Sequence, residues 1–229
     1  MTAELAGAVV VVTGSSSGIG AATARAVSAA GAHPVLVARR VELLRELAGA
    51  LPAATVVAED LRDPGAAGRV IDAALAVSGR LDALVNNAGM LVMGPVVECR
   101  DVSELFAVNV FTPVELMRRA LEVMVPQGTG AIVTVSTGEL ALERPHPEHG
   151  AYVASKAALT AFTDAAREEL RGVGGVSVST VYPGATDTPM WALARGNPNT
   201  PDIPAGPVER VADAIVGLIT GGDAEFRCW

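Results

Sequence analysis

A tyrosine and a lysine four residues apart are the side chains of this sequence with the clearest chemical potential. Of the 17 cationic residues only Lys156 is a lysine, and it follows Tyr152 at helical spacing. On a helix these two positions share one face, so the ammonium would lie near the phenol. A nearby positive charge favours the phenolate and lowers the phenol pKa. The pair therefore predicts acid–base chemistry at Tyr152, because an acidified phenol transfers protons at neutral pH.

A glycine-rich turn near the start of the chain predicts a nucleotide-binding site. It follows the apolar run 9–12 and precedes a helical pattern. Its residues are Gly14, Ser15, Ser16, Ser17, Gly18, Ile19 and Gly20. Glycines let the backbone approach a pyrophosphate, and the helix that follows presents free N–H groups and its positive dipole end. The order of strand, turn and helix favours this interpretation over a simple tight turn.

Two arginines after the second apolar run indicate which dinucleotide binds. This run ends at Ala38, where an acidic residue would bind the ribose 2′-hydroxyl of NAD, and Arg39 and Arg40 follow. Arginines at this point accommodate the 2′-phosphate of NADP. We therefore predict NADP(H) as the preferred cofactor and NAD(H) as the less favoured one.

These groups need a scaffold that brings them together. Short β-branched runs alternate with longer Ala- and Leu-rich segments, which is typical of an α/β fold, a parallel sheet with helices on both faces. We predict strands at 8–13, 34–38, 54–58, 82–86, 130–136, 176–182 and 224–228. We predict helices at 18–31, 41–50, 64–78, 102–124, 150–172 and 207–220. Residues 1–229 are expected to form a single domain.

The longest predicted loop is 187–206, which is rich in Pro, Asn and Gly. Loops of this kind often cover a binding site. Within it, Met190, Trp191 and Leu193 would either form an apolar substrate wall or pack a short helix on the core. Upstream, His146 and His149 form a His-x-x-His pair between prolines. Because no third ligand is evident in the sequence, we interpret them as solvated loop histidines and predict no metal site.

Composition narrows the range of partners. The formal net charge is −8 and only 3% of the residues are aromatic, which argues against a nucleic-acid partner. No apolar run approaches the length of a membrane span, and the apolar start lacks the features of a signal peptide. Two cysteines, Cys99 and Cys228, are too few for a disulfide framework. We interpret them as free thiols and expect a cytoplasmic protein.

The motifs together resemble those of the short-chain dehydrogenases/reductases. Those that match, in the family's order and near its spacing, are 13–20, Asn86-Asn87-Ala88-Gly89, Asn109, Tyr152-x-x-x-Lys156 and Pro183-Gly184. The resemblance covers essentially the whole chain. It implies a Rossmann-type doubly wound parallel sheet of about seven strands, with the cofactor across the carboxyl ends of the strands. Homodimers or homotetramers are common in the family, so one of these is expected.

The resemblance also implies roles for residues that spacing alone would not single out. Cofactor-contacting positions are matched by Asp60, Leu61, Asn86, Ala88, Gly89, Pro183, Gly184, Thr186 and Thr188. Asn109 matches an asparagine that positions a water in a proton relay. Lys156 matches the lysine that lowers the pKa of the tyrosine and holds the nicotinamide ribose. Thr186 departs mildly from the family, which usually has Ile or Val there.

One catalytic position departs further from the family pattern. The fifth strand usually ends in two serines, the second of which polarises the substrate carbonyl; here Ser136 and Thr137 follow the strand. Counting from the strand favours Thr137, and Ser136 remains the alternative. The resemblance implies an enzyme that interconverts a small-molecule carbonyl and an alcohol by hydride transfer. A non-catalytic NADP(H) sensor, or a reductase of an imine or double bond, stays open.

Overall fold

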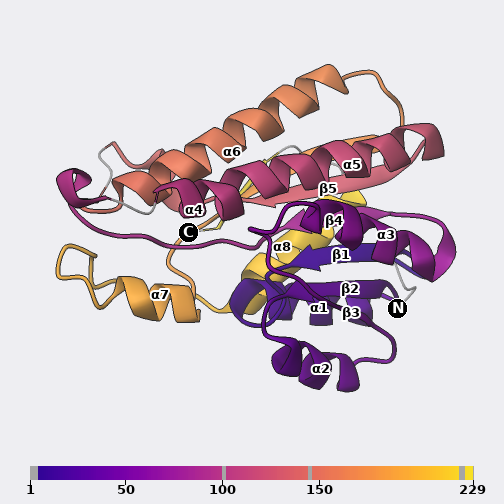
Figure 1. The fold of residues 1–229 in the computed structure, drawn as a ribbon, viewed down its shortest axis with the longest axis horizontal. Coiled ribbons are helices and arrows are strands. Elements are labelled where there is room, and N and C mark those ends of the chain that lie inside the picture. Colours follow the sequence, from indigo (N-terminus) through magenta and orange to yellow (C-terminus); the bar gives the residue numbers. More distant parts are fainter. Residues whose placement is uncertain (1–4, 100–101, 144–145, 222–224, 229) are drawn as a thin grey trace.

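A computed structural model describes residues 5–99, 102–143, 146–221 and 225–228. Seven parallel strands form one sheet in the order β3-β2-β1-β4-β5-β6-β7 (Figure 1). The strands are β1 (Val9–Thr13), β2 (His33–Ala38), β3 (Thr55–Ala58), β4 (Ala83–Asn86), β5 (Gly130–Val135), β6 (Val176–Pro183) and β7 (Glu225–Cys228). The chain runs outward from β1 to β3 on one side and from β4 to β7 on the other, as in a doubly wound sheet. The predicted fold class and strand count are confirmed.

Strands buried on both faces explain the continuous apolar runs of the sequence. In β1, Val9 and Val11 belong to one core cluster, whereas Val10 and Val12 belong to the cluster on the other face. Val10 pairs with Pro34 of β2 on one side and Ala83 of β4 on the other. This central position of β1 places the glycine-rich turn that follows it in the middle of the carboxyl edge of the sheet.

Helices cover both faces of the sheet (Figure 1). They are α1 (Gly18–Ala29), α2 (Val41–Gly49), α3 (Ala66–Ser78), α4 (Val102–Phe106), α5 (Thr112–Gln127), α6 (Gly150–Glu169), α7 (Pro189–Ala194) and α8 (Val208–Gly221). Shorter turns are η1 (Val96–Glu98), the π-helical turn η2 (Ala107–Phe111) and η3 (Gly138–Ala141). Helices α3 and α5 pack on one face of the sheet, and α1 and α8 pack on the other. None of the helices in the described ranges is long and apolar enough to cross a bilayer.

Two predicted elements differ from the structure. The predicted helix 102–124 is α4, η2 and α5 in succession, because the Thr112 N–H bonds the carbonyl of Ala107, five residues back. Pro113 follows directly and has no N–H to continue the α-helical pattern. The predicted loop 187–206 contains α7, whose first turn begins with Thr188 accepting a hydrogen bond from the Trp191 N–H. The strand predicted at 224–228 is β7, and residue 224 lies outside the described residues.

Candidate active site

A cavity of about 770 Å³ lies at the carboxyl edge of the sheet. Most of the predicted site residues line it: Gly14, Ser16, Ser17, Gly18, Ile19, Arg39, Arg40, Asp60, Leu61, Ala88, Gly89, Ser136, Thr137, Tyr152, Lys156, Pro183, Gly184, Thr186 and Thr188. Four predicted residues do not line it, namely Ser15, Gly20, Asn86 and Asn109. Segments far apart in the sequence thus meet where ligands bind in open α/β sheets.

The glycine-rich turn is built so that no side chain fills its cradle. Gly14 has a φ of 70°, and a Cβ there would lie 2.8 Å from the Cα of Ala88. Gly18 has a φ of 55°, and its Cβ would lie 3.0 Å from the Thr188 side chain. Helix α1 begins at Gly18 with an extended Ser17 before it and no side-chain cap. The turn therefore leaves backbone N–H groups at a helix start, which is the arrangement that binds a pyrophosphate.

Gly20 serves a different purpose, the close approach of α1 to the turn. A Cβ at Gly20 would lie 2.4 Å from the backbone oxygen of Gly14. We expect Gly20→Ala to lower the free energy of unfolding by about 1–3 kcal/mol and to weaken dinucleotide binding, because the helix must move away. Gly217→Ala in α8, where a Cβ meets nothing within 4 Å, is the matched control and should be neutral or mildly stabilising. Chemical denaturation of both variants measures the difference, and equal effects would contradict this explanation.

Arg40 reaches back over the glycine-rich turn. Its Nη2 donates hydrogen bonds of 2.8 Å to Ser16 Oγ and to Ser17 Oγ. Arg39 stands beside it with its side chain 67% exposed, 4.0 Å from the carboxylate of Asp60. The guanidinium groups therefore lie at the end of β2, at the rim of the cavity.

The acidic residues next to these arginines are engaged elsewhere. Asp60 is held by Arg62 at 2.6 Å, and this contact, together with Arg39, lowers the pKa of Asp60 to about 2. Glu59 forms a bidentate pair with Arg69, with both contacts at 2.7 Å, and its pKa is lowered by that hydrogen bonding. Arg62 and Arg69 are therefore the main partners of these carboxylates, and Arg39 makes only a 4.0 Å contact with Asp60.

The end of β4 and the segment after it place one predicted residue outside the cavity and a further residue in its lining. Asn86 is buried and donates to the Pro113 carbonyl at 3.2 Å, away from the cavity. Asn87 instead lines the cavity and donates from Nδ2 to the Thr13 carbonyl at 2.8 Å. The Thr13 hydroxyl accepts the N–H groups of Asn87 and Ala88, both at 3.0 Å. Successive side chains along a strand point to opposite sides, so Asn86 and Asn87 face different surroundings. This alternation is the sequence signal that could have separated their roles.

The two candidate hydroxyls after β5 point to different neighbours. Ser136 Oγ lies 2.8 Å from the Thr160 hydroxyl of α6, so it bonds to the scaffold. The Thr137 side chain lies near the phenol of Tyr152 and lowers the pKa of that phenol. Thr137 also caps η3, because its Oγ1 accepts the Glu139 N–H at 3.3 Å. Geometry therefore brings Thr137, and not the Ser136 hydroxyl, together with the tyrosine.

Tyr152 and Lys156 share the buried face of α6, as their spacing predicted. The predicted effect on the phenol is wrong, however: burial and the charge of Glu139 raise the pKa of Tyr152 to about 12, although the Thr137 hydrogen bond lowers it. Burial also lowers the pKa of the Lys156 ammonium to about 8. Its Nζ donates to the Val135 carbonyl at 2.8 Å, so the ammonium is bound to the end of β5. Desolvation opposes the charged form of both groups and is the main cause of both shifts.

Asn109 lies in the π-helical turn η2 and is fully buried behind the cavity wall. Its Oδ1 accepts the Met90 N–H at 2.7 Å, and its Nδ2 donates to the Met90 carbonyl and to Ser155 Oγ, both at 2.9 Å. Ser155 lies between Tyr152 and Lys156 in sequence and bonds the Tyr152 carbonyl at 2.7 Å. Asn109 therefore ties the segment after β4 to the helix of the tyrosine–lysine pair, and the π-helical turn re-aims it there.

The histidines at the start of α6 differ from the sequence-based interpretation. His149 is only 1% exposed, and its Nδ1 lies 2.8 Å from Glu139 Oε1, so it is not a solvated loop residue. His146 Nδ1 lies 3.3 Å from the other carboxylate oxygen of Glu139. All three residues line the cavity. Glu139, the partner of both histidines, lies in η3. The sequence did not identify it as a partner, because the sequence pattern does not predict this turn.

Residues of the segment from 183 to 206, which contains α7, line one side of the cavity. Met190, Trp191 and Leu193 line the cavity and lie in the short helix α7. Thr186 Oγ1 donates to the Gly184 carbonyl at 3.0 Å, which folds the chain back after β6. Together with Leu91, Leu142 and Ile203, these side chains give that end of the cavity an apolar wall.

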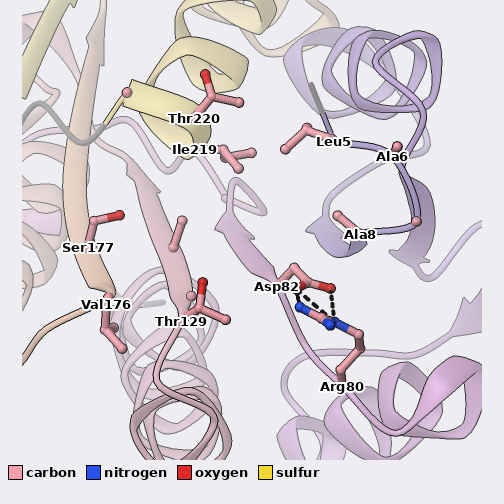
Figure 2. Close-up of a pocket in the computed structure, with 15 residues that line it drawn as sticks. Leu5, Ala6, Ala8, Arg80, Asp82, Thr129, Val176, Ser177, Ile219 and Thr220 are labelled. Carbon is pink, nitrogen blue, oxygen red and sulfur yellow. Dashed lines mark hydrogen bonds and ion pairs between the residues drawn. The ribbon is translucent and has the colours of Figure 1, made fainter. Parts of the chain in front are cut away.

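A second cavity, of about 560 Å³, lies at the opposite edge of the sheet (Figure 2). It is lined by the residues that begin β5 and β6 and by the end of α8. Its two charged side chains, Arg80 and Asp82, bond to each other, and Asp82 also accepts the Val9 N–H at 2.8 Å. Because these groups satisfy one another at the amino ends of the strands, this cavity is not a candidate active site.

Comparison with known proteins agrees with this geometry. A short chain dehydrogenase family model matches residues 8–198. Dehydrogenase/reductase SDR family member 7B from Bos taurus is 36% identical over 202 residues, which are 82% of this chain and 61% of the relative. A short chain dehydrogenase from Burkholderia cenocepacia, solved with NADP, is 28% identical with a TM-score of 0.87, covering 98% of this chain and 97% of that one. A 3-ketoacyl-(acyl-carrier-protein) reductase from Brucella melitensis, complexed with NADH, is 25% identical with a TM-score of 0.86, covering 97% of each.

The chain therefore belongs to the short-chain dehydrogenase/reductase family of oxidoreductases. It spans 60–63% of the length of the first curated relatives that it matches. Solved relatives bind NADP or NAD.

Proposed function

We propose that this chain is an NADP(H)-dependent oxidoreductase that interconverts a carbonyl and an alcohol, with residues 1–229 acting as one catalytic domain. The observation that supports this most strongly is the meeting of Thr137, Tyr152 and Lys156 in one cavity with the glycine-rich turn. A phenol with a pKa of about 12 stays protonated at neutral pH, so it is suited to donate a proton during reduction.

The residues present fit a dinucleotide. A Cβ at Gly14 or Gly18 would fill the cradle, and the N-terminus of α1 faces the space that they leave open. The glycine-rich turn would hold the pyrophosphate, Leu61 and Asp60 the adenine end, and Lys156 the nicotinamide ribose. Ala88, Gly89, Pro183, Gly184, Thr186 and Thr188 would line the rest of the dinucleotide site. When bound, the nicotinamide would supply the hydride for the carbonyl carbon.

The protein's own residues would handle the oxygen and its proton. The Thr137 hydroxyl would donate a hydrogen bond to the substrate oxygen, which stabilises the negative charge that develops there. Tyr152 would transfer its phenolic proton to that oxygen. Lys156, charged below its pKa of about 8, would stabilise the phenolate that remains. Asn109 would hold a relay water through the second lone pair of Oδ1, since its amide hydrogens are already bonded within the protein.

The choice of Thr137 over Ser136 can be tested by removing each hydroxyl. We expect Thr137→Val to lower kcat by roughly 10²-fold, because one donor to the developing oxyanion is lost. Ser136→Ala should change kcat little, since its hydroxyl bonds Thr160. Thr137→Ser keeps the donor and should retain most activity. Steady-state kinetics of the three variants measures these effects on kcat. A large loss in Ser136→Ala with little loss in Thr137→Val would assign the catalytic hydroxyl to Ser136.

The preference for NADP(H) is carried by the arginines after β2. We expect Arg40→Ala to reduce the ratio of NADPH to NADH affinity by roughly 10- to 100-fold, the effect of losing hydrogen bonds to a charged phosphate. Arg45→Ala on the exposed side of α2, where Arg45 pairs only with Glu42 among described contacts, is the matched control. Titration of both variants with NADPH and NADH measures the ratio. An unchanged ratio in Arg40→Ala and Arg39→Ala would overturn the assigned preference.

A cofactor sensor without turnover is the alternative from another functional class. Such a protein would need the glycine-rich turn, but not a buried phenol and ammonium, whose burial is unfavourable to stability. NADPH oxidation over a panel of aldehydes, ketones and ketoacyl thioesters separates the two. We expect turnover within this panel. Turnover only with added imines or activated double bonds would correct the substrate class, and binding without any turnover would favour the sensor.

The exposed aromatic side chains of α6 and the turn before α5 bear on assembly. Phe162 is 51% exposed and Phe111 is 62% exposed. Large apolar groups at the surface favour burial against another chain. They support a homodimer or homotetramer that pairs through this side of the molecule.

A further inference from the structure

Three side chains beside the reaction centre converge on a single point. The ligand atoms of Glu139, His146 and His149 all lie within 4.8 Å of one another. His149 Nδ1 is 2.8 Å from Glu139 Oε1, and His146 Nδ1 is 3.3 Å from Glu139 Oε2. Two ligand atoms bound tetrahedrally to zinc at about 2.0 Å lie about 3.3 Å apart. The spacing of this cluster is therefore close to that of a zinc coordination sphere.

Two of these atoms lack the hydrogen bonds that buried polar atoms normally have. Glu139 Oε2 and His146 Nδ1 are inaccessible to solvent, and within the described residues neither has a hydrogen-bond partner. A carboxylate oxygen and an imidazole nitrogen with facing lone pairs repel each other unless a proton or a metal cation lies between them. These unpartnered atoms are a second, independent indication of a bound ion.

An outer contact orients His149 for coordination. Its Nε2 lies 3.2 Å from the hydroxyl of Thr200, on the far side of the ring from Glu139. With Nε2–H donating to Thr200, Nδ1 presents its lone pair toward the cluster. Metal-binding histidines commonly donate their other N–H in this way, which fixes the tautomer and the ring.

The backbone before His149 is held in an unfavourable conformation. Glu148 has a φ of 68°, the left-handed value that no other non-glycine residue of the described ranges adopts. Its carbonyl accepts the Gly94 N–H at 2.9 Å, and its Oε2 accepts the Asn197 side chain at 2.6 Å. Such a residue costs about 1–3 kcal/mol and persists where its surroundings impose it, often at functional sites. Here it delivers His149 to the cluster.

We propose that Glu139, His146 and His149 bind a divalent transition-metal ion, for which zinc is the best match. Two imidazoles and a carboxylate are a three-ligand set that leaves a further coordination position open. All three residues line the cavity that holds Tyr152 and Thr137, so the open position faces the space where a substrate would bind. The site is separate from the dinucleotide-binding residues and goes beyond the proposed hydride transfer.

The test is zinc binding by the tag-free, chelator-treated protein, followed by calorimetric titration with zinc chloride. We expect one ion per chain. His146→Ala and Glu139→Gln should each weaken zinc binding about a hundredfold or more, and Thr200→Val, which keeps all three ligands, roughly tenfold. The absorption spectrum of the cobalt-loaded protein provides a second readout. We expect it to lack a thiolate charge-transfer band, because the three proposed ligands bind through nitrogen and oxygen.

Two variants control for adventitious binding. His33→Ala removes the remaining histidine of the chain, whose Nε2 bonds Thr55 of the neighbouring strand. Cys99→Ser removes a free thiol. Neither should change the stoichiometry or the affinity. Less than one ion per wild-type chain would overturn the proposal, as would equal affinity in wild type, His146→Ala and Glu139→Gln. Thermal unfolding verifies that each variant is folded. If a variant of a ligand residue does not fold, the zinc affinity of Thr200→Val still tests the proposal, because this variant keeps all three ligands.

Discussion

Tyr152→Phe is expected to lower kcat for carbonyl reduction by about 10³-fold while leaving NADPH affinity nearly unchanged. The substitution removes one oxygen from a side chain that is 9% exposed, and the ring keeps its packing on α6. What is lost is the phenolic proton donor that lies near Thr137. The expected split, with kcat reduced and cofactor binding retained, is the signature of a group that acts on the reacting atoms.

Single-turnover kinetics with saturating NADPH measures this effect without interference from product release. Tyr182→Phe is the matched control, because it removes the hydroxyl of the chain's other tyrosine, in β6. It should keep near-normal turnover. If Tyr152→Phe retained wild-type turnover with the cofactor bound, Tyr152 would not be the proton donor.

Lys156→Arg is expected to reduce turnover by roughly 10²-fold in a folded protein, although both side chains are cationic. Lys156 is 3% exposed, and its Nζ fits between the Val135 carbonyl and Gly89, where a Cβ would lie 3.5 Å from it. A planar guanidinium is larger and forms its bonds in a fixed fork, so it cannot take this position without displacing its neighbours. Arg171→Lys, at an exposed position just after α6, is the control and should leave turnover unchanged.

The pH profile separates lost charge from lost packing. The pKa of Lys156 is lowered to about 8, so the ammonium is charged below that pH and neutral above it. Wild-type turnover should therefore fall as the pH rises through about 8. The residual turnover of Lys156→Arg should not fall in this window, because a guanidinium keeps its proton. The same fall in both proteins would mean that another group titrates.

Much of the fold follows from the sequence because buried parallel strands have a simple pattern. The runs that became β1 and β5 are apolar without interruption, and a strand buried on both faces requires this. The glycine-rich turn was equally clear, since Gly14 and Gly20 are needed for close backbone contacts that no other residue allows. In these places one local requirement determines both residue type and structure.

Other features depend on contacts that sequence spacing does not contain. The phenol of Tyr152 was expected to be acidic because Lys156 is near, but burial of the phenol has the largest effect on its pKa. Whether Asn86 or Asn87 faces the cavity depends on where β4 ends. The pairing of Glu139 with His149 joins residues ten apart through an irregular segment. Each of these depends on tertiary geometry, which periodicity does not report.

The central claim is that the chain transfers hydride from NADPH to a carbonyl carbon with Tyr152 as proton donor. Mass spectrometry of the product formed with NADPH deuterated at both hydrogens of nicotinamide C4 tests this most directly. We predict that the wild-type protein forms an alcohol with one deuterium on its carbinol carbon. Tyr152→Phe should form almost none of this product. NADPH binding with no transfer of deuterium to any carbonyl substrate would contradict the account.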